Sequence, residues 1–232
     1  MRSLALLFLG ALLLLPASPA SDAPTASQRF ERLYRATQTL RVTFLEQYSE
    51  NHKLLRSEAG TAFFRKPGKM RWEYEKPEKN LFLVDGKFAW FSTPSDHTVT
   101  KVAARQSEDW RAPFMLLAGG IKLSRVCSRV QSTSVLVPEK MGDAVLECQL
   151  RGSEGRRPGN PEDTSPRVFF EIAGDGQLVR LLVQAAGGIE TEFQFKNWEI
   201  NPTVPDSLFQ FSPPPGAVIV DGLLPSSAGV RQ

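Results

Sequence analysis

The stretch Gly60–Pro77, GTAFFRKPGKMRWEYEKP, constrains the fold of this chain more than any other. In its second half Met70, Trp72 and Tyr74 alternate with charged residues, and a period of two is typical of a strand with one apolar face. The segment 66–69, Lys-Pro-Gly-Lys, predicts a turn, because proline fixes φ and glycine tolerates a positive φ. The stretch therefore predicts a β-hairpin with one apolar and one charged face.

Short apolar runs separated by turn residues continue along the chain, and Asp85-Gly86 is the strongest of the hairpin signals. A helix is predicted over Ala26–Thr39, and a short apolar helix over Ala112–Gly120. We therefore expect a mainly β fold, a single antiparallel meander of about eleven strands that forms a barrel or an unclosed half-barrel. The predicted strands are 40–50, 54–64, 69–74, 81–84, 87–91, 98–104, 127–136, 144–150, 168–172, 178–184 and 191–198, with a short edge strand at 218–220.

The first residues predict an export signal. Arg2 precedes the apolar run Leu4–Leu15, which is shorter than the ~20 residues that span a bilayer. Ser18-Pro19-Ala20 predicts cleavage after Ala20, so that residues 1–20 are removed, 21–221 form one domain and 222–232 form a loose tail. No cysteine stands near the cleavage site, and we expect an exported protein without a lipid anchor.

Charge and motifs argue against several classes of function. The formal net charge is +3, which favours neither nucleic acid nor a strongly acidic partner. His52 and His97 both stand in predicted turns, and no catalytic or nucleotide-binding motif occurs. We expect no enzyme, no cofactor and no metal site. The polar stretch Gly152–Arg167 predicts a long loop.

The two cysteines are Cys127 and Cys148. In an oxidising compartment an even number of cysteines favours a disulfide between them. Two separate buried thiols are the alternative.

The many apolar and aromatic residues on alternating strand faces allow two interpretations. A closed barrel of about eight strands could fill its interior with them, as an ordinary core. A half-barrel of about eleven strands is too wide to do so and needs a plug or a ligand. The short apolar helix is suited to be such a plug.

At this point the sequence resembles a known family, the LolA family of periplasmic outer-membrane lipoprotein carriers. The motifs that carry the resemblance follow the family's order from Arg29 to Asp221. They are Phe44–Gln47, Gly60–Pro77, Val84–Lys87 with Trp90, Pro113–Leu117 and Phe209–Gly216.

The resemblance implies an unclosed antiparallel barrel of about eleven strands with a short helical lid. It further implies a periplasmic carrier whose cavity takes up the acyl chains of lipoproteins. No feature of the sequence indicates oligomerisation, and we expect a monomer. The expected partners are acylated lipoproteins, an inner-membrane ABC-type releasing complex and the outer-membrane receptor LolB. A LolA-like protein that carries another lipid, or that senses lipoproteins for a signalling partner, is the alternative.

On this basis we predict the residues of the site. The lid is predicted to consist of Phe114, Met115, Leu116 and Leu117. In the family an arginine before the turn proline latches the lid by binding its carbonyls; here that position is Lys66, and Arg65 stands beside it. The predicted cavity wall consists of Phe63, Met70, Trp72, Tyr74, Leu83, Phe88 and Trp90.

Overall fold

The computed structural model describes residues 23–104, 114–119, 122–151 and 166–221. Its three α-helices are α1 (Ala23–Ala36), α2 (Met115–Gly119) and α3 (Leu123–Val126). Three short 3-10 segments cover Pro94–Asp96, Ala186–Gly188 and Asp206–Phe209. The strands are β1 (Thr39–Glu50), β2 (Lys53–Arg65), β3 (Lys69–Lys76), β4 (Leu81–Val84), β5 (Phe88–Thr93), β6 (Thr98–Ala103), β7 (Cys127–Ser132), β8 (Ala144–Leu150), β9 (Arg167–Ile172), β10 (Leu178–Gln184), β11 (Ile189–Ile200) and β12 (Val218–Asp221).

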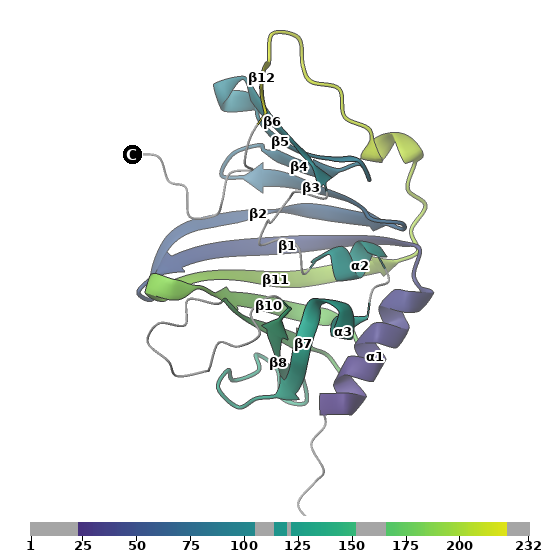
Figure 1. Ribbon diagram of the computed structural model, residues 1–232, viewed down its shortest axis with the longest axis vertical. Helices are drawn as coiled ribbons and strands as arrows, with labels where there is room; N and C mark the ends of the chain where they lie inside the picture. The colour runs from purple at the N-terminus through teal and green to yellow at the C-terminus, as the bar shows by residue number, and fades with distance from the viewer. Residues whose placement is uncertain (1–22, 105–113, 120–121, 152–165, 222–232) are drawn as a thin grey trace, which may run out of the picture.

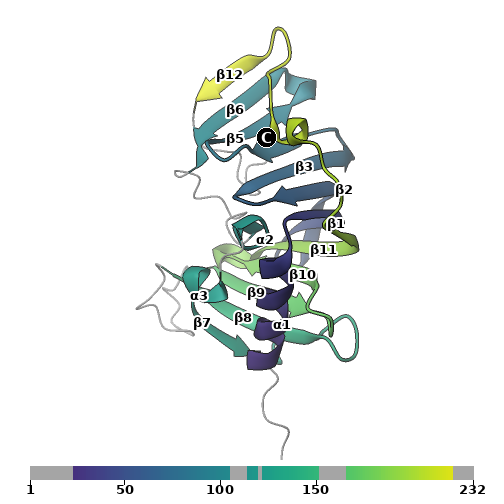
Figure 2. The same cartoon turned by 90° about the vertical axis from the view of Figure 1, so that its right-hand side faces the viewer.

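These strands form one sheet of twelve in the order β12-β6-β5-β4-β3-β2-β1-β11-β10-β9-β8-β7. The sheet consists of two antiparallel meanders, β1–β6 and β7–β11, that are joined where β1 pairs with β11. It is strongly curved and does not close, because its edge strands β7 and β12 lie far apart (Figures 1 and 2). The predicted unclosed, mainly β architecture is confirmed. The first eleven strands are antiparallel as predicted, whereas β12 pairs with β6 in parallel.

All three helices contribute to the concave side of the sheet. Their buried residues Phe30, Tyr34, Leu116 and Leu123 belong to one hydrophobic cluster with the inward-facing strand residues. Figure 2 shows α2 in the bend between the two meanders and α1 beside the β8–β10 half. Helix α1 ends at Ala36, earlier than predicted, because the chain enters β1 at Thr39. Helix α3 was not predicted.

The hairpin Gly60–Pro77 forms as expected. Met70, Trp72 and Tyr74 are buried, opposite Phe64, Ala62 and Gly60. Gly60 is required by a close approach, since a Cβ atom there would lie 1.9 Å from the backbone oxygen of Glu73.

Cys127 and Cys148 form a disulfide between β7 and β8, with Cα atoms 5.5 Å apart. The bridge therefore fastens β7, an edge strand of the sheet, to its neighbour. The predicted export segment 1–20 and the tail 222–232 lie outside the described residues, as does most of the predicted loop 152–167.

Candidate functional site

An aromatic cluster occupies the concave side of the sheet, with Trp72 at its centre. The Trp72 side chain contacts rings from its own meander, with centroids 4.8 Å away at Phe44 and 5.7 Å away at Phe64. It also contacts rings of β11, 5.6 Å away at Phe193 and 6.3 Å away at Phe195. One indole therefore packs against strands on both sides of the junction between β1 and β11.

The segment that begins at Phe114 covers this cluster. The Phe114 ring lies 4.8 Å from Trp72 and 4.9 Å from Phe193, so it packs between the two meanders. Leu116 and Leu117 of α2, two of the predicted lid residues, are buried as well; the side chain of Met115 lies outside the described part. A backbone hydrogen bond of 3.0 Å from the amide of Gly68 to the carbonyl oxygen of Ala118 ties α2 to the β2–β3 turn.

Helix α1 covers the neighbouring part of the concave side. Its Tyr34 ring packs 5.8 Å from Trp198, and the Tyr34 hydroxyl accepts a hydrogen bond of 3.0 Å from the amide of Leu178. Burial raises the pKa of the Tyr34 hydroxyl well above its ordinary value, so this group stays neutral. Helix α1 is thus fixed to β10 and β11.

The predicted latch residues bind elsewhere than expected. The Lys66 ammonium group donates to the carbonyl oxygens of Tyr34, at 2.6 Å, and Arg35, at 2.8 Å. It therefore holds the C-terminal end of α1 rather than α2, and partial burial there lowers its pKa. Arg65 donates to Asp206 and to the carbonyl of Val204, because the next residue along a strand points to the opposite face. Among the hydrogen bonds of the described residues, the one from the turn to α2 comes from Gly68.

The predicted cavity wall divides between the two faces of the sheet. Met70, Trp72 and Tyr74 lie on the concave face, under or beside the helices. The prediction is wrong for Phe63, Leu83, Phe88 and Trp90. Arg71 pairs with Phe63 on one side and with Leu83 on the other, and Leu83 in turn pairs with Trp90. Residues that pair directly point to the same face of a sheet, so these side chains share the outer face with Arg71. Phe88 lies two residues before Trp90 in β5 and therefore points to the same face.

The C-terminal segment after β11 covers this outer face. Arg71 donates to the carbonyl of Leu208, and the Arg65 guanidinium lies 5.3 Å from the Phe209 ring centroid. Further along, Phe211 packs 5.4 Å from Trp90. Trp90 of the outer face is therefore part of a structural contact with the C-terminal segment, which short-range patterns could not reveal.

Sequence reasoning missed other residues of the concave face. Phe82 and Phe91 pair directly with each other, and Phe82 pairs with Trp72, so both belong to this face. The run Leu81–Val84 is apolar at every position, and alternation could not tell which of its residues face inward. Phe193 and Phe195 alternate with polar residues, and this pattern marks them as residues of one apolar strand face, although the predicted cavity wall did not include them.

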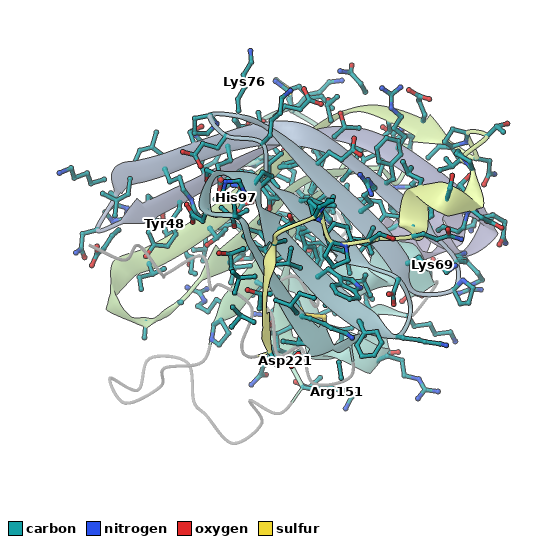
Figure 3. All side chains as sticks on the ribbon, turned by 90° about the horizontal axis from the view of Figure 1, so that it is seen from above. Tyr48, Lys69, Lys76, His97, Arg151 and Asp221 are labelled. Atoms are coloured by element: carbon teal, nitrogen blue, oxygen red, sulfur yellow. A yellow bond between two sulfur atoms is a disulfide. The ribbon has the colours of Figure 1, made fainter. Side chains whose placement is uncertain are left out.

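The concave face becomes polar away from the β2–β3 turn. Glu46 is 2% exposed and accepts a hydrogen bond of 2.8 Å from the Tyr74 hydroxyl. Glu58, directly opposite Glu46, forms an ion pair of 3.0 Å with Arg56. Seen from above, Tyr48 at this end and Lys69 at the turn lie on opposite sides of the molecule (Figure 3). Along β1–β3 the concave face thus changes from apolar near the β2–β3 turn to charged at the opposite end.

The part of the chain that the structure describes lacks two further kinds of feature. No group of three His, Cys, Asp or Glu side chains in it could hold a metal ion. No helix in it is long and apolar enough to cross a membrane.

Comparisons with known proteins agree with this geometry. The family profile described as outer membrane lipoprotein carrier protein LolA matches residues 35–141, and one described as predicted periplasmic protein matches residues 177–222. The periplasmic location that the resemblance implies is thereby confirmed.

Among curated proteins, an outer-membrane lipoprotein carrier protein of Dechloromonas aromatica is 29% identical over 79% of this chain and 82% of its own length. One of Nitrosomonas europaea is 27% identical over 77% and 82%. A solved structure of an uncharacterized conserved protein from Thermus thermophilus shares the fold, with a TM-score of 0.50 at 12% identity over 86% of this chain and 98% of that one. These matches, together with the unclosed sheet and its covering helices, show that the chain is similar to outer-membrane lipoprotein carrier proteins of the LolA type.

Proposed function

We propose that this protein binds the acyl chains of lipoproteins on the concave face of its sheet and, as a monomer, carries them from the inner to the outer membrane. The observation that supports this most is the position of Phe114. Its ring fills the centre of an apolar surface built from both meanders, yet it belongs to a segment next to a helix of only five residues. A short helix is only marginally stable by itself, so it can be displaced from such a surface.

A displaceable plug solves an energetic problem of lipid transport. Each buried CH₂ group contributes about 0.8 kcal/mol, so three acyl chains amount to roughly 30–40 kcal/mol. This free energy is larger than that of any known noncovalent complex, because binding free energies reach a limit at about −20 kcal/mol. A plug that occupies the same surface offsets part of this free energy, because the chains must displace it. Uptake and release can then both occur.

The proposed partners follow from this transport route. An ABC-type complex of the inner membrane would supply the acylated lipoprotein, and an outer-membrane receptor such as LolB would accept it. Mass spectrometry of lipids that copurify with the protein from its native periplasm tests the cargo. Acylated lipoprotein would support the proposal, whereas free phospholipid or glycolipid, or no lipid, would contradict it.

A substitution in the lid tests the plug. Leu116→Glu places a charge in the buried lid and should open the surface, so that a fluorescent fatty acid binds more tightly while the sheet stays folded. Leu54→Glu is the matched control, because Leu54 is exposed and far from the lid. Unchanged probe binding in Leu116→Glu, in a folded protein, would contradict the role of the lid.

A further inference from the structure

The indole nitrogen of Trp72 lacks a hydrogen-bond acceptor. The side chain is 0% exposed, and its Nε1 atom is one of three buried side-chain polar atoms of the described residues that have no partner. Of the residues that carry these atoms, Trp72 belongs to the hydrophobic cluster of the concave side. The unpartnered donor is therefore inside the candidate site.

The other described tryptophans behave differently. Trp90 Nε1 donates to Asp85 Oδ2 at 2.9 Å, and Trp198 Nε1 donates to the carbonyl oxygen of Leu178 at 2.9 Å. This is the usual state of buried polar groups, of which the large majority have a partner. A buried donor without an acceptor destabilises a protein by about 1–3 kcal/mol. Phenylalanine at position 72 would fill an apolar core without this penalty.

The surroundings of Trp72 supply apolar rings and no acceptor. Five phenylalanine rings surround the indole, and their faces are only weak acceptors for an N–H group. Four of the rings belong to β1, β2 and β11, which are fixed in the sheet. The fifth is Phe114, 4.8 Å away, which belongs to the lid. Removing the lid would therefore expose the donor to whatever takes its place.

We propose that the Trp72 indole N–H binds the ester or amide carbonyl oxygen at the head of an acyl chain. This inference rests on the proposed function. An acyl chain is attached to the rest of the lipid molecule through a carbonyl group. A ligand that replaces Phe114 therefore brings both an apolar chain and a carbonyl oxygen that can accept a hydrogen bond. The phenyl ring satisfies the apolar surface alone, whereas the acyl ligand satisfies the surface and the donor. The site thereby prefers acyl lipids to hydrocarbon of the same size.

The test compares two lipids that differ only in this acceptor. A diacylglycerol and a dialkylglycerol ether with identical chains compete with a fluorescent fatty acid for the purified protein. The wild type should bind the ester about fivefold more tightly than the ether, as expected for one hydrogen bond of ordinary strength. Trp72→Phe should lose the preference and bind both lipids equally. Trp90→Phe is the control and should keep the preference, because its indole is on the outer face and already donates to Asp85.

A second measurement needs no variant. In the wild type labelled with ¹⁵N, the indole N–H resonance of Trp72 should shift downfield when the ester lipid binds and should not do so with the ether. A wild type that binds both lipids equally, or a preference that persists in Trp72→Phe, would overturn the inference and leave the proposed function intact. Failure of the wild type to bind either lipid would overturn the proposed function and the inference with it.

Discussion

Phe114→Ala should raise the affinity for an acyl ligand and lower the stability of the protein by the same free energy. If ligand and lid compete for one surface, the ligand must first displace the closed lid, and the free energy of lid closure is subtracted from the free energy of ligand binding. The same free energy of closure contributes to the stability of the folded protein. Weakening the lid therefore lowers the stability and strengthens ligand binding by the same free energy. The two measurements therefore report one equilibrium.

The structure sets the size of the effect. The Phe114 side chain is 1% exposed and lies 4.8 Å, 4.9 Å and 5.8 Å from the rings of Trp72, Phe193 and Phe195. Removing a buried phenyl group from a rigid core costs about 3–5 kcal/mol. In a lid the loss cannot exceed the free energy with which the lid is bound, because beyond that point the lid stays open. We expect a loss of about 2 kcal/mol, which corresponds to a gain of about thirtyfold in affinity.

Urea unfolding and titration with a fluorescent fatty acid measure the two quantities. The control is Phe170→Ala on β9, a buried ring of the sheet itself. It should lose about 3–5 kcal/mol without any gain in affinity, because the sheet does not compete with the ligand. If Phe114→Ala loses stability without gaining affinity, Phe114 is an ordinary core residue and the reasoning is refuted.

Three further predictions concern the supports of the site. Lys66→Met removes both hydrogen bonds to the end of α1 and should destabilise the protein by about 1–3 kcal/mol, with faster hydrogen exchange in the last turn of α1; unaltered exchange there would contradict the role of Lys66. Reducing the Cys127–Cys148 disulfide, which spans a sequence separation of 21, should cost about 3 kcal/mol and lower the thermal midpoint, and a midpoint unchanged by reductant would argue against a structural role. Burial alone would raise the pKa of Asp85, but hydrogen bonds from Phe88, Trp90 and Lys87 outweigh it and lower the pKa. Its carboxylate therefore stabilises the fold at neutral pH, and this contribution is lost as the pH falls from the ordinary pKa of 3.8 through the lowered value; Asp85→Asn should weaken the pH dependence of urea unfolding in this range.

The predictable parts of the fold were those where one local pattern decides. Alternation in Met70, Trp72 and Tyr74 identified the inner face of β3, because charged residues mark the other face. In Phe63-Phe64 both residues are aromatic, and the inward one is Phe64, opposite Met70. Nothing within the pair decides between them; only the register with the next strand does.

The less predictable parts depend on contacts between distant segments. The local sequence predicts Trp90 as part of the cavity wall. In the structure it packs against Phe211, more than a hundred residues further along the chain. Lys66 similarly binds α1 because the turn and the end of that helix meet in space, at residues 34 and 35. The lysine that stands at position 66 in place of the family's arginine does not by itself reveal that the carbonyl oxygens of residues 34 and 35 are its partners.

The joining of the meanders at β1 and β11 has a consequence for how the exported chain folds. Strands β1–β6 pair with their neighbours in sequence, so this half can form as soon as its residues are available. The backbone groups of β1 that later bond to β11 then stay unpaired until residues 189–200 are available. Phe44 is one of the residues of β1 that wait for a partner in β11. An open edge with apolar side chains is prone to pair with other chains. The pairing of Phe44 with Phe195 therefore ends the period in which the newly exported protein is most exposed to aggregation.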